Sequence, residues 1–316
     1  MTEFQYIVEK GEEGLSIKDI LRRHFSFSSR LMTKLKFQNL IFLNGMPMPG
    51  WVPVSDGDII QIHMPEEHSD FPPEDIPIIP VYEDSYLLVL NKQAGTAVHP
   101  TKGKPNHTIA NGLMKKMEED GESYKIRFVN RLDMNTSGLL LVAKNGFVQE
   151  EIIKQMRRHQ VTKKYIAVVT GVIPEEEGTI DLPLGRPFPD QVERWVLPEE
   201  QGGSPSVTHY RVIRRYPRHT LVELKLETGR THQIRIHLSY IGYPIEGDHL
   251  YCHGDPFLYR CLHGDTHEEK VSPYIDRQAL HACLLEFRHP ITDRSIRCQA
   301  PLPEDMQALI RQIQSL

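Results

Sequence analysis

The sequence predicts an α+β protein whose larger part is a mixed, largely antiparallel sheet with flanking helices. At 316 residues, the chain exceeds one average domain and is long enough for two. Beyond residue 80, segments with strand patterns outnumber helical ones, and several neighbours are joined by short turns. That region has neither a glycine-rich phosphate loop nor a regular strand-helix repeat, which favours the α+β class.

A small α/β domain is expected at residues 1–66. Two helices and two strands are predicted in it, at 16–25, 28–37, 40–45 and 54–64. Ser16 and Asp19 form a capping pair for the first helix, and Ser28 or Ser29 caps the second. An Asn-Gly turn ends the first strand.

Positive charge gathers on this small domain although the whole chain carries a formal net charge of -5. Five cations on its predicted helices are candidates for binding a polyanion: Arg22, Arg23, Arg30, Lys34 and Lys36. A second basic cluster follows at Lys154, Arg157, Arg158, Lys163 and Lys164. Each cluster is either a polyanion footprint or an ordinary solvated face.

Residues 67–80 are predicted to form an acidic, proline-rich linker before a second domain at 81–316. From Glu66 to Asp84 the chain has no Lys or Arg, and it contains Pro72, Pro73, Pro77 and Pro80. Such a segment cannot form a helix, and we expect it to bury little surface.

The composition favours a cytoplasmic protein with reduced thiols. The N-terminus has no apolar core region typical of a signal peptide. The four cysteines of the chain all lie in its last quarter. No apolar stretch approaches the roughly 20 residues that cross a bilayer. A monomer is expected, because no heptad seam is evident.

The predicted elements of the second domain are mostly strands. Strands are expected at 85–92, 125–129, 138–145, 163–171, 207–216 and 219–229, and helices at 148–159 and 231–242. Between the second and third of these strands lies the sequence NRLDMNTSG, residues 130–138. Its small polar residues are typical of a turn, so Asp133 is either a turn former or a reactive carboxylate at the edge of a sheet.

Five motifs in the second domain resemble, in the same order, those of the RluA-type family of pseudouridine synthases. They are LLVLNKQAGTAVHP, RLDMNTSGLLLVAKN, KKYIAVVTG, LETGRTHQIRIHL and RQALHACLLEFRHP. Asn130 stands where His often precedes Arg-Leu-Asp, and Gln93 where Pro often follows Lys, so substrate preference and loop shape can differ. The N-terminal segment resembles the S4 RNA-binding domain, with Asn39 in place of a usual Gly.

The resemblance implies an enzyme that isomerises uridine within structured RNA and needs no cofactor or metal. It makes Asp133 the catalytic carboxylate, which either attacks C1′ or removes a ribose proton. Arg230 is the implied cation that keeps Asp133 ionised. Tyr165 would lie against the uracil and is a candidate for transferring the C5 proton, and Arg131 would fill the space left by the flipped base.

Other interpretations remain. A non-catalytic RNA-binding or ribosome-assembly factor could use the same fold, and the RNA could be ribosomal, which the S4-like domain favours, or transfer RNA. A zinc site must also be considered, because Cys252, His253, Cys261, His263 and His267 lie close together, although their spacing is irregular. We interpret His232 as a structural histidine.

Overall fold

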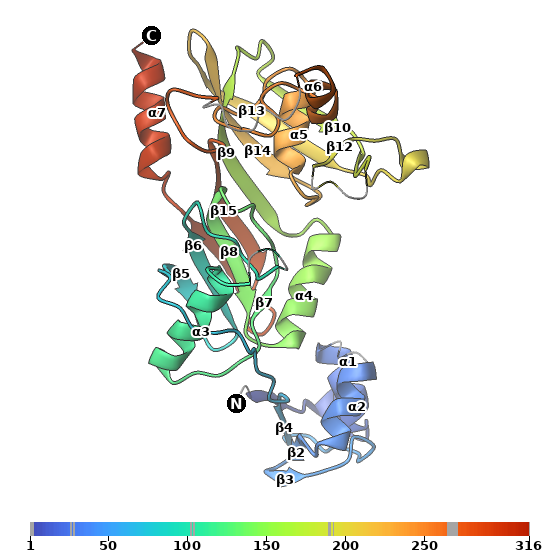
Figure 1. Cartoon of the computed structure of the whole chain (residues 1–316). Coiled ribbons are helices and arrows are strands. Elements are labelled where there is room, and N and C mark those ends of the chain that lie inside the picture. Colours follow the sequence, from blue (N-terminus) through green and yellow to red (C-terminus); the bar gives the residue numbers. More distant parts are fainter. Residues whose placement is uncertain are drawn as a thin grey trace.

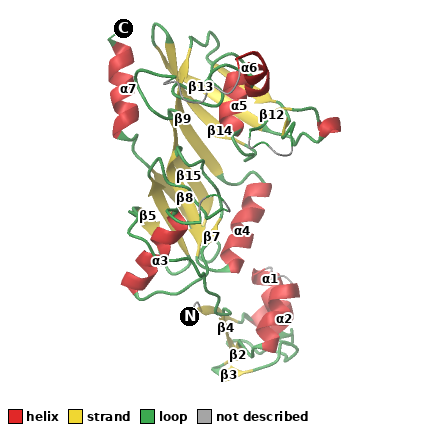
Figure 2. Cartoon of the chain, in the orientation of Figure 1, coloured by secondary structure: helices red, strands yellow, loops and turns green. Residues whose placement is uncertain are grey.

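The computed structural model describes residues 3–25, 27, 29–101, 103, 105–188, 191, 193–263 and 271–315. It confirms the α+β class, with strands running through the larger part of the chain and helices along their flanks (Figure 2). Among these described residues, no helix has both the length and the apolar character needed to cross a membrane.

The N-terminal part is a four-stranded sheet with two helices. Its strands lie in the order β1-β4-β2-β3. The bounds are β1 Glu3–Ile7, β2 Ile41–Leu43, β3 Met46–Pro47 and β4 Ile59–His63 for the strands, and α1 Ile17–Phe25 and α2 Ser29–Phe37 for the helices, with a 3-10 turn at Lys10–Glu12. Both predicted helices are confirmed, whereas β1 was not predicted.

Two local predictions can be checked in this part. The backbone N–H of Asp19 donates to Ser16 Oγ at 3.2 Å, so the expected pair at the start of α1 is formed. Asn39 adopts a left-handed backbone with φ 54°, a conformation that Asn tolerates better than most residues. Ser28, one of the two expected caps of α2, lies outside the described residues.

The larger part is built on a ten-stranded sheet in the order β10-β13-β14-β9-β15-β8-β6-β5, with β16 beside β15 and β7 beside β8. The strands are β5 Pro80–Glu83, β6 Leu87–Lys92, β7 Arg127–Phe128, β8 Ser137–Ala143, β9 Thr162–Thr170, β10 Glu177–Asp181, β13 Val207–Arg215, β14 His219–Leu226, β15 Leu280–Arg288 and β16 Ser295–Gln299. Its one parallel pair within the described chain is β15 with β8, so the sheet is mixed and largely antiparallel as predicted. A short hairpin joins β11 Leu184–Gly185 to β12 Trp195–Val196, and a 3-10 turn follows at Glu199–Gln201.

Helices cover both faces of this sheet (Figure 1). They are α3 Ile109–Asp120, α4 Gly146–Arg157, α5 Gln233–Tyr240, α6 Pro256–His263 and α7 Glu304–Gln314. The apolar side chains of α3, α5 and α7 belong to one core, and those of α4 belong to a second core. Leu88 and Leu90 of β6 point into the first core while Leu87 and Val89 point into the second, which explains the continuous apolar run in that strand.

Residues 64–79 contain no regular secondary structure, yet they pack more closely than a free linker would. Phe71, Ile76 and Ile78 contact the core that α3 covers. Gly112 on α3 makes room for them, because a β carbon there would lie 2.8 Å from the carbonyl oxygen of Ile76. The apolar residues between the prolines therefore hold the segment against the core, although none of residues 67–80 is fully buried.

The N-terminal part packs directly on α4. The ring of Phe147 lies 5.3 Å from that of Phe4 and 4.9 Å from that of Phe27, measured between centroids. These rings belong to the same apolar cluster as the β6 and β8 side chains on that face of the sheet. The two parts thus share one core rather than meeting only through a linker.

Gly138 allows the parallel strands β8 and β15 to come together. It has φ 111°, and a β carbon on it would lie 2.2 Å from the carbonyl oxygen of Ala282. No other residue type fits both the backbone conformation and the approach. This glycine closes the NRLDMNTSG segment, so it fixes where that loop enters the sheet.

We therefore expect Gly138→Ala to lower the free energy of unfolding by more than about 3 kcal/mol. Gly146→Ala is the control, because a β carbon there makes only ordinary contacts, the nearest at 3.6 Å to Arg127. Chemical denaturation of both variants measures the difference, and equal stability of the two would contradict the argument.

Candidate active site

Asp133 lies in a loop whose backbone is bound by the side chain of a buried lysine, Lys92. The Lys92 ammonium donates to the carbonyl oxygens of Gln93, Thr96 and Met134, each at 2.8 Å. Burial lowers the pKa of Lys92 to about 7, and the negative charge of Asp133 acts in the opposite sense. Since Met134 follows Asp133 directly, this lysine fixes the backbone beside the carboxylate.

Further side chains fix both ends of the same loop. Asn130 donates to the Leu139 carbonyl at 3.2 Å and accepts from the Leu141 N–H at 2.8 Å. Arg277 donates to the Asn135 carbonyl at 3.0 Å. Asn130, where the resembled family often has His, is thus a structural residue that ties the loop to β8.

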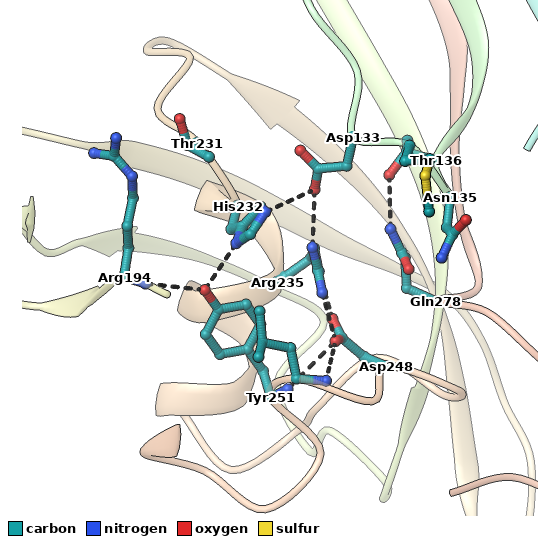
Figure 3. A network of polar contacts seen from close by, with 12 residues as sticks. Asp133, Asn135, Thr136, Arg194, Thr231, His232, Arg235, Asp248, Tyr251 and Gln278 are labelled. Atoms are coloured by element: carbon teal, nitrogen blue, oxygen red, sulfur yellow. Dashed lines mark hydrogen bonds and ion pairs between the residues drawn. The ribbon is translucent and has the colours of Figure 1, made fainter. Parts of the chain in front are cut away.

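Arg235 is the cation that pairs with Asp133 (Figure 3). Its Nη1 lies 3.1 Å from Asp133 Oδ2, while Nε and Nη2 donate to the two oxygens of Asp248 at 2.7 and 2.8 Å. Arg235 and Asp248 are buried, and the Asp133 side chain is about a quarter exposed. Although burial alone would lower it, the two carboxylates raise the pKa of Arg235, so its charge is permanent.

This geometry corrects the predicted role of Arg230. That residue precedes α5, is exposed, and donates from Nε to the Pro205 carbonyl at 3.3 Å, without an ion pair to Asp133 among the described contacts. Arg235 lies within α5 and points inward. His232, with φ 58°, starts the helix between the two arginines, so they face different directions. Arg230 still lines the cavity beside Asp133.

A tyrosine and a histidine complete the network in Figure 3. Tyr251 is fully buried, and its hydroxyl lies 2.8 Å from His232 Nδ1 and accepts from the Arg194 N–H at 3.3 Å. Burial lowers the pKa of His232, which favours its neutral form. Its Nε2 is 3.9 Å from Asp133 Oδ2, too long for a hydrogen bond. Asp248 and Tyr251 were not predicted to belong to the site. The sequence indicates only that an acid and an aromatic residue follow α5 by a few positions.

Tyr165 lines the same cavity as Asp133. It lies in the central strand β9, is 7 % exposed, and shares a cavity of about 60 Å³ with Asp133, Arg230 and Arg235. Burial, then the charge of Asp133, raises the pKa of the Tyr165 phenol. Leu132 is buried in the core, and neighbouring Arg131 is exposed, with its Nη2 3.3 Å from Thr231 Oγ1.

The predicted polyanion-binding cations of the N-terminal part differ in their surroundings. Arg22, Arg23 and Lys36 are exposed on α1 and α2. Lys34 instead pairs with Glu67 at 3.1 Å, and Glu67 also pairs with Arg127 of the larger part. The side chain of Arg30 lies outside the described residues.

The cysteine and histidine segment forms no metal cluster within the described residues. His253 stacks on Tyr259 with centroids 4.2 Å apart, and the four cysteines are free thiols. The side chain of His263 and all of His267 lie outside the described part.

Arg235→Gln is expected to lower the free energy of unfolding by about 3–5 kcal/mol, because it leaves Asp248 buried without its partner. Arg230→Gln, at an exposed arginine of the same motif, should stay within about 0.5 kcal/mol of the wild type. Urea denaturation of the two variants measures this, and a larger loss for Arg230→Gln than for Arg235→Gln would contradict the pairing described here.

Comparison with known proteins identifies the family of the chain. The family model described as RNA pseudouridylate synthase matches residues 86–240. The protein is 38 % identical to the uncharacterized RNA pseudouridine synthase YjbO of Bacillus subtilis, over 90 % of this chain and 94 % of that protein. It is 34 % identical to ribosomal large subunit pseudouridine synthase D of Xylella fastidiosa, over 97 % of this chain and 91 % of the relative.

Solved structures agree on the fold. Human RNA pseudouridylate synthase domain containing 4 superimposes with a TM-score of 0.59 at 24 % identity, covering 75 % of this chain and 93 % of that one. Human RNA pseudouridylate synthase domain containing 1 gives a TM-score of 0.54 at 24 % identity, covering 78 % and 98 %. The chain belongs to the RluA-type family of RNA pseudouridine synthases and is an isomerase of that kind.

Proposed function

We propose that this enzyme converts uridine to pseudouridine in large-subunit ribosomal RNA, with Asp133 as its catalytic carboxylate. The observation that carries this is the ion pair of Asp133 with the buried Arg235, in a cavity shared with Tyr165. The RNA class is taken from the relatives named as large-subunit enzymes.

The reaction needs an ionised carboxylate beside the ribose. The N1–C1′ bond breaks, the uracil turns over, and a C5–C1′ bond forms, so atoms are conserved. Asp133 either attacks C1′ or removes a ribose proton, and both roles require the charged form. Arg235 places a permanent positive charge beside Asp133, and its own pairing with Asp248 fixes its direction.

Tyr165 is proposed to support the uracil ring rather than to remove its proton as a phenolate. Its buried position and the nearby Asp133 charge keep the phenol protonated at neutral pH. A neutral hydroxyl can still relay a proton, because it both donates and accepts hydrogen bonds. Arg131, exposed next to Asp133, is proposed to occupy the space left by the flipped nucleotide.

The N-terminal residues 1–66 are proposed to be an S4-like RNA-binding domain, followed by a segment at 67–80 and the catalytic domain at 81–316. Their two helices, small sheet and exposed Arg22, Arg23 and Lys36 support this. Because Lys34 pairs with Glu67, we leave it out of the proposed RNA surface.

Asp133→Asn should lower the rate of pseudouridine formation by about a thousandfold or more while RNA binding stays within a few-fold of the wild type. Asp293→Asn, an exposed acid in a turn, is the control. Retained turnover in Asp133→Asn would refute the catalytic assignment, and a wild type that binds RNA without modifying it would favour an RNA-binding factor.

The substrate is tested by mapping pseudouridines in cells with and without the gene. We expect one or more positions to disappear from large-subunit ribosomal RNA and to return with the wild-type protein but not with Asp133→Asn. Loss confined to transfer RNA would contradict the proposed substrate.

Neutralising Arg22, Arg23 and Lys36 together by Gln should weaken RNA binding and reduce the slope of log K against log salt by about 2–3. Substitution avoids deleting a domain whose core continues into the catalytic domain. A triple variant of Lys125, Lys225 and Arg311, also exposed, matches the change in net charge and should leave the slope nearly unaltered.

A further inference from the structure

Lys163 differs from the other cations of the basic cluster formed by Lys154, Arg157, Arg158, Lys163 and Lys164. Lys154 pairs with Glu151 at 2.6 Å, and Lys164 pairs with Glu223 at 3.0 Å. Arg157 and Arg158 are exposed to solvent. Lys163 alone combines partial burial with no hydrogen-bond or ion-pair partner among the described residues.

The side chain of Lys163 lies on the active-site side of strand β9. Alternate residues of a strand share a face, so Lys163 lies on the face of Tyr165 and Lys164 on the opposite one. The Lys163 Nζ reaches the loop between β14 and α5, because a β carbon placed on Gly229 would lie 3.6 Å from it. That loop continues into Arg230, which lines the cavity of Asp133.

A partly buried ammonium without an acid is costly for the free protein. Protein interiors normally pair such charges, because desolvation is otherwise uncompensated. Burial lowers the pKa of Lys163, and no carboxylate contributes in the opposite sense. A bound anion beside Lys163 would offset this cost.

We propose that Lys163 binds a phosphate of the RNA backbone next to the target uridine and so positions that nucleotide over Tyr165. This inference rests on the proposed function, because RNA is the ligand that brings phosphates to the cavity. One hydrogen-bonded phosphate would satisfy the ammonium and fix the strand at the point where the base leaves the stack.

The test compares full-length Lys163→Met, Lys163→Arg and Lys164→Met with the wild type on unmodified large-subunit ribosomal RNA transcribed in vitro. We expect Lys163→Met to raise KM and the binding Kd about tenfold. The slope of log K against log salt should fall by about 0.7–0.9, as for one lost phosphate contact. Lys163→Arg should recover most of the affinity. Lys164→Met should remain within about twofold, because Glu223 keeps Arg211 at 3.2 Å as a partner.

Thermal unfolding separates this role from a structural one. Replacing an unpaired, partly buried cation by methionine should raise Tm, whereas loss of a structural lysine would lower it. A lower Tm with unchanged RNA affinity, or weaker binding with an unchanged salt slope, would overturn the proposal. If the wild type binds this RNA but forms no pseudouridine, the proposed function fails while the binding comparison still decides the role of Lys163.

Discussion

The guanidinium of Arg235, which binds both Asp133 and Asp248, is the interaction on which the proposed active site depends. Asp248 is fully buried and binds two of the guanidinium nitrogens, which leaves Nη1 directed at Asp133. Asp133 is 102 positions away from Arg235 in the sequence, so the fold must bring the β7–β8 loop to helix α5. A buried ion pair contributes little net stability. The three hydrogen bonds of this guanidinium nevertheless fix its direction. The site thus uses a costly interaction to orient one carboxylate.

Hydrogen bonds to the loop backbone on both sides of Asp133 keep the carboxylate in this orientation. Lys92 holds the carbonyl of Met134, and Asn130 ties the start of the loop to β8. Gly138 allows β8 to lie against β15, the one parallel pair in the described sheet. Asn130 and Gly138 of NRLDMNTSG therefore fix the loop that carries Asp133. The turn and the proposed catalytic carboxylate belong to one structure.

The fold was largely predictable from the sequence, because its strands and the first two helices have clear periodicity and caps. Helices α3, α6 and α7 were not predicted. In α3, Gly112 and polar residues interrupt the apolar pattern, although Thr108 and Gly121 mark its ends. The choice between Arg230 and Arg235 could not be made from spacing. It depends on the left-handed His232 that starts α5, and such a backbone conformation has no reliable sequence signal. The role of Asp248 could not be predicted from the sequence either, because the burial of an acid depends on tertiary contacts.

The junction between the two parts bears on how RNA would be presented to the site. Phe4 and Phe27 pack on Phe147 of α4, and Glu67 joins Lys34 to Arg127 across the junction. A proline-rich tether alone would leave the N-terminal helices free to take many orientations. Shared apolar burial restricts them, so cations on α1 and α2 keep a defined distance from Asp133. The proposed RNA surface on these helices is consistent with a formal net charge of -5, because the basic residues gather locally. Glu67 pairs with Lys34 and Arg127 at the junction, while Arg22, Arg23 and Lys36 remain exposed on the helices. For binding a polyanion, the positions of the exposed cations matter more than the net charge of the whole chain.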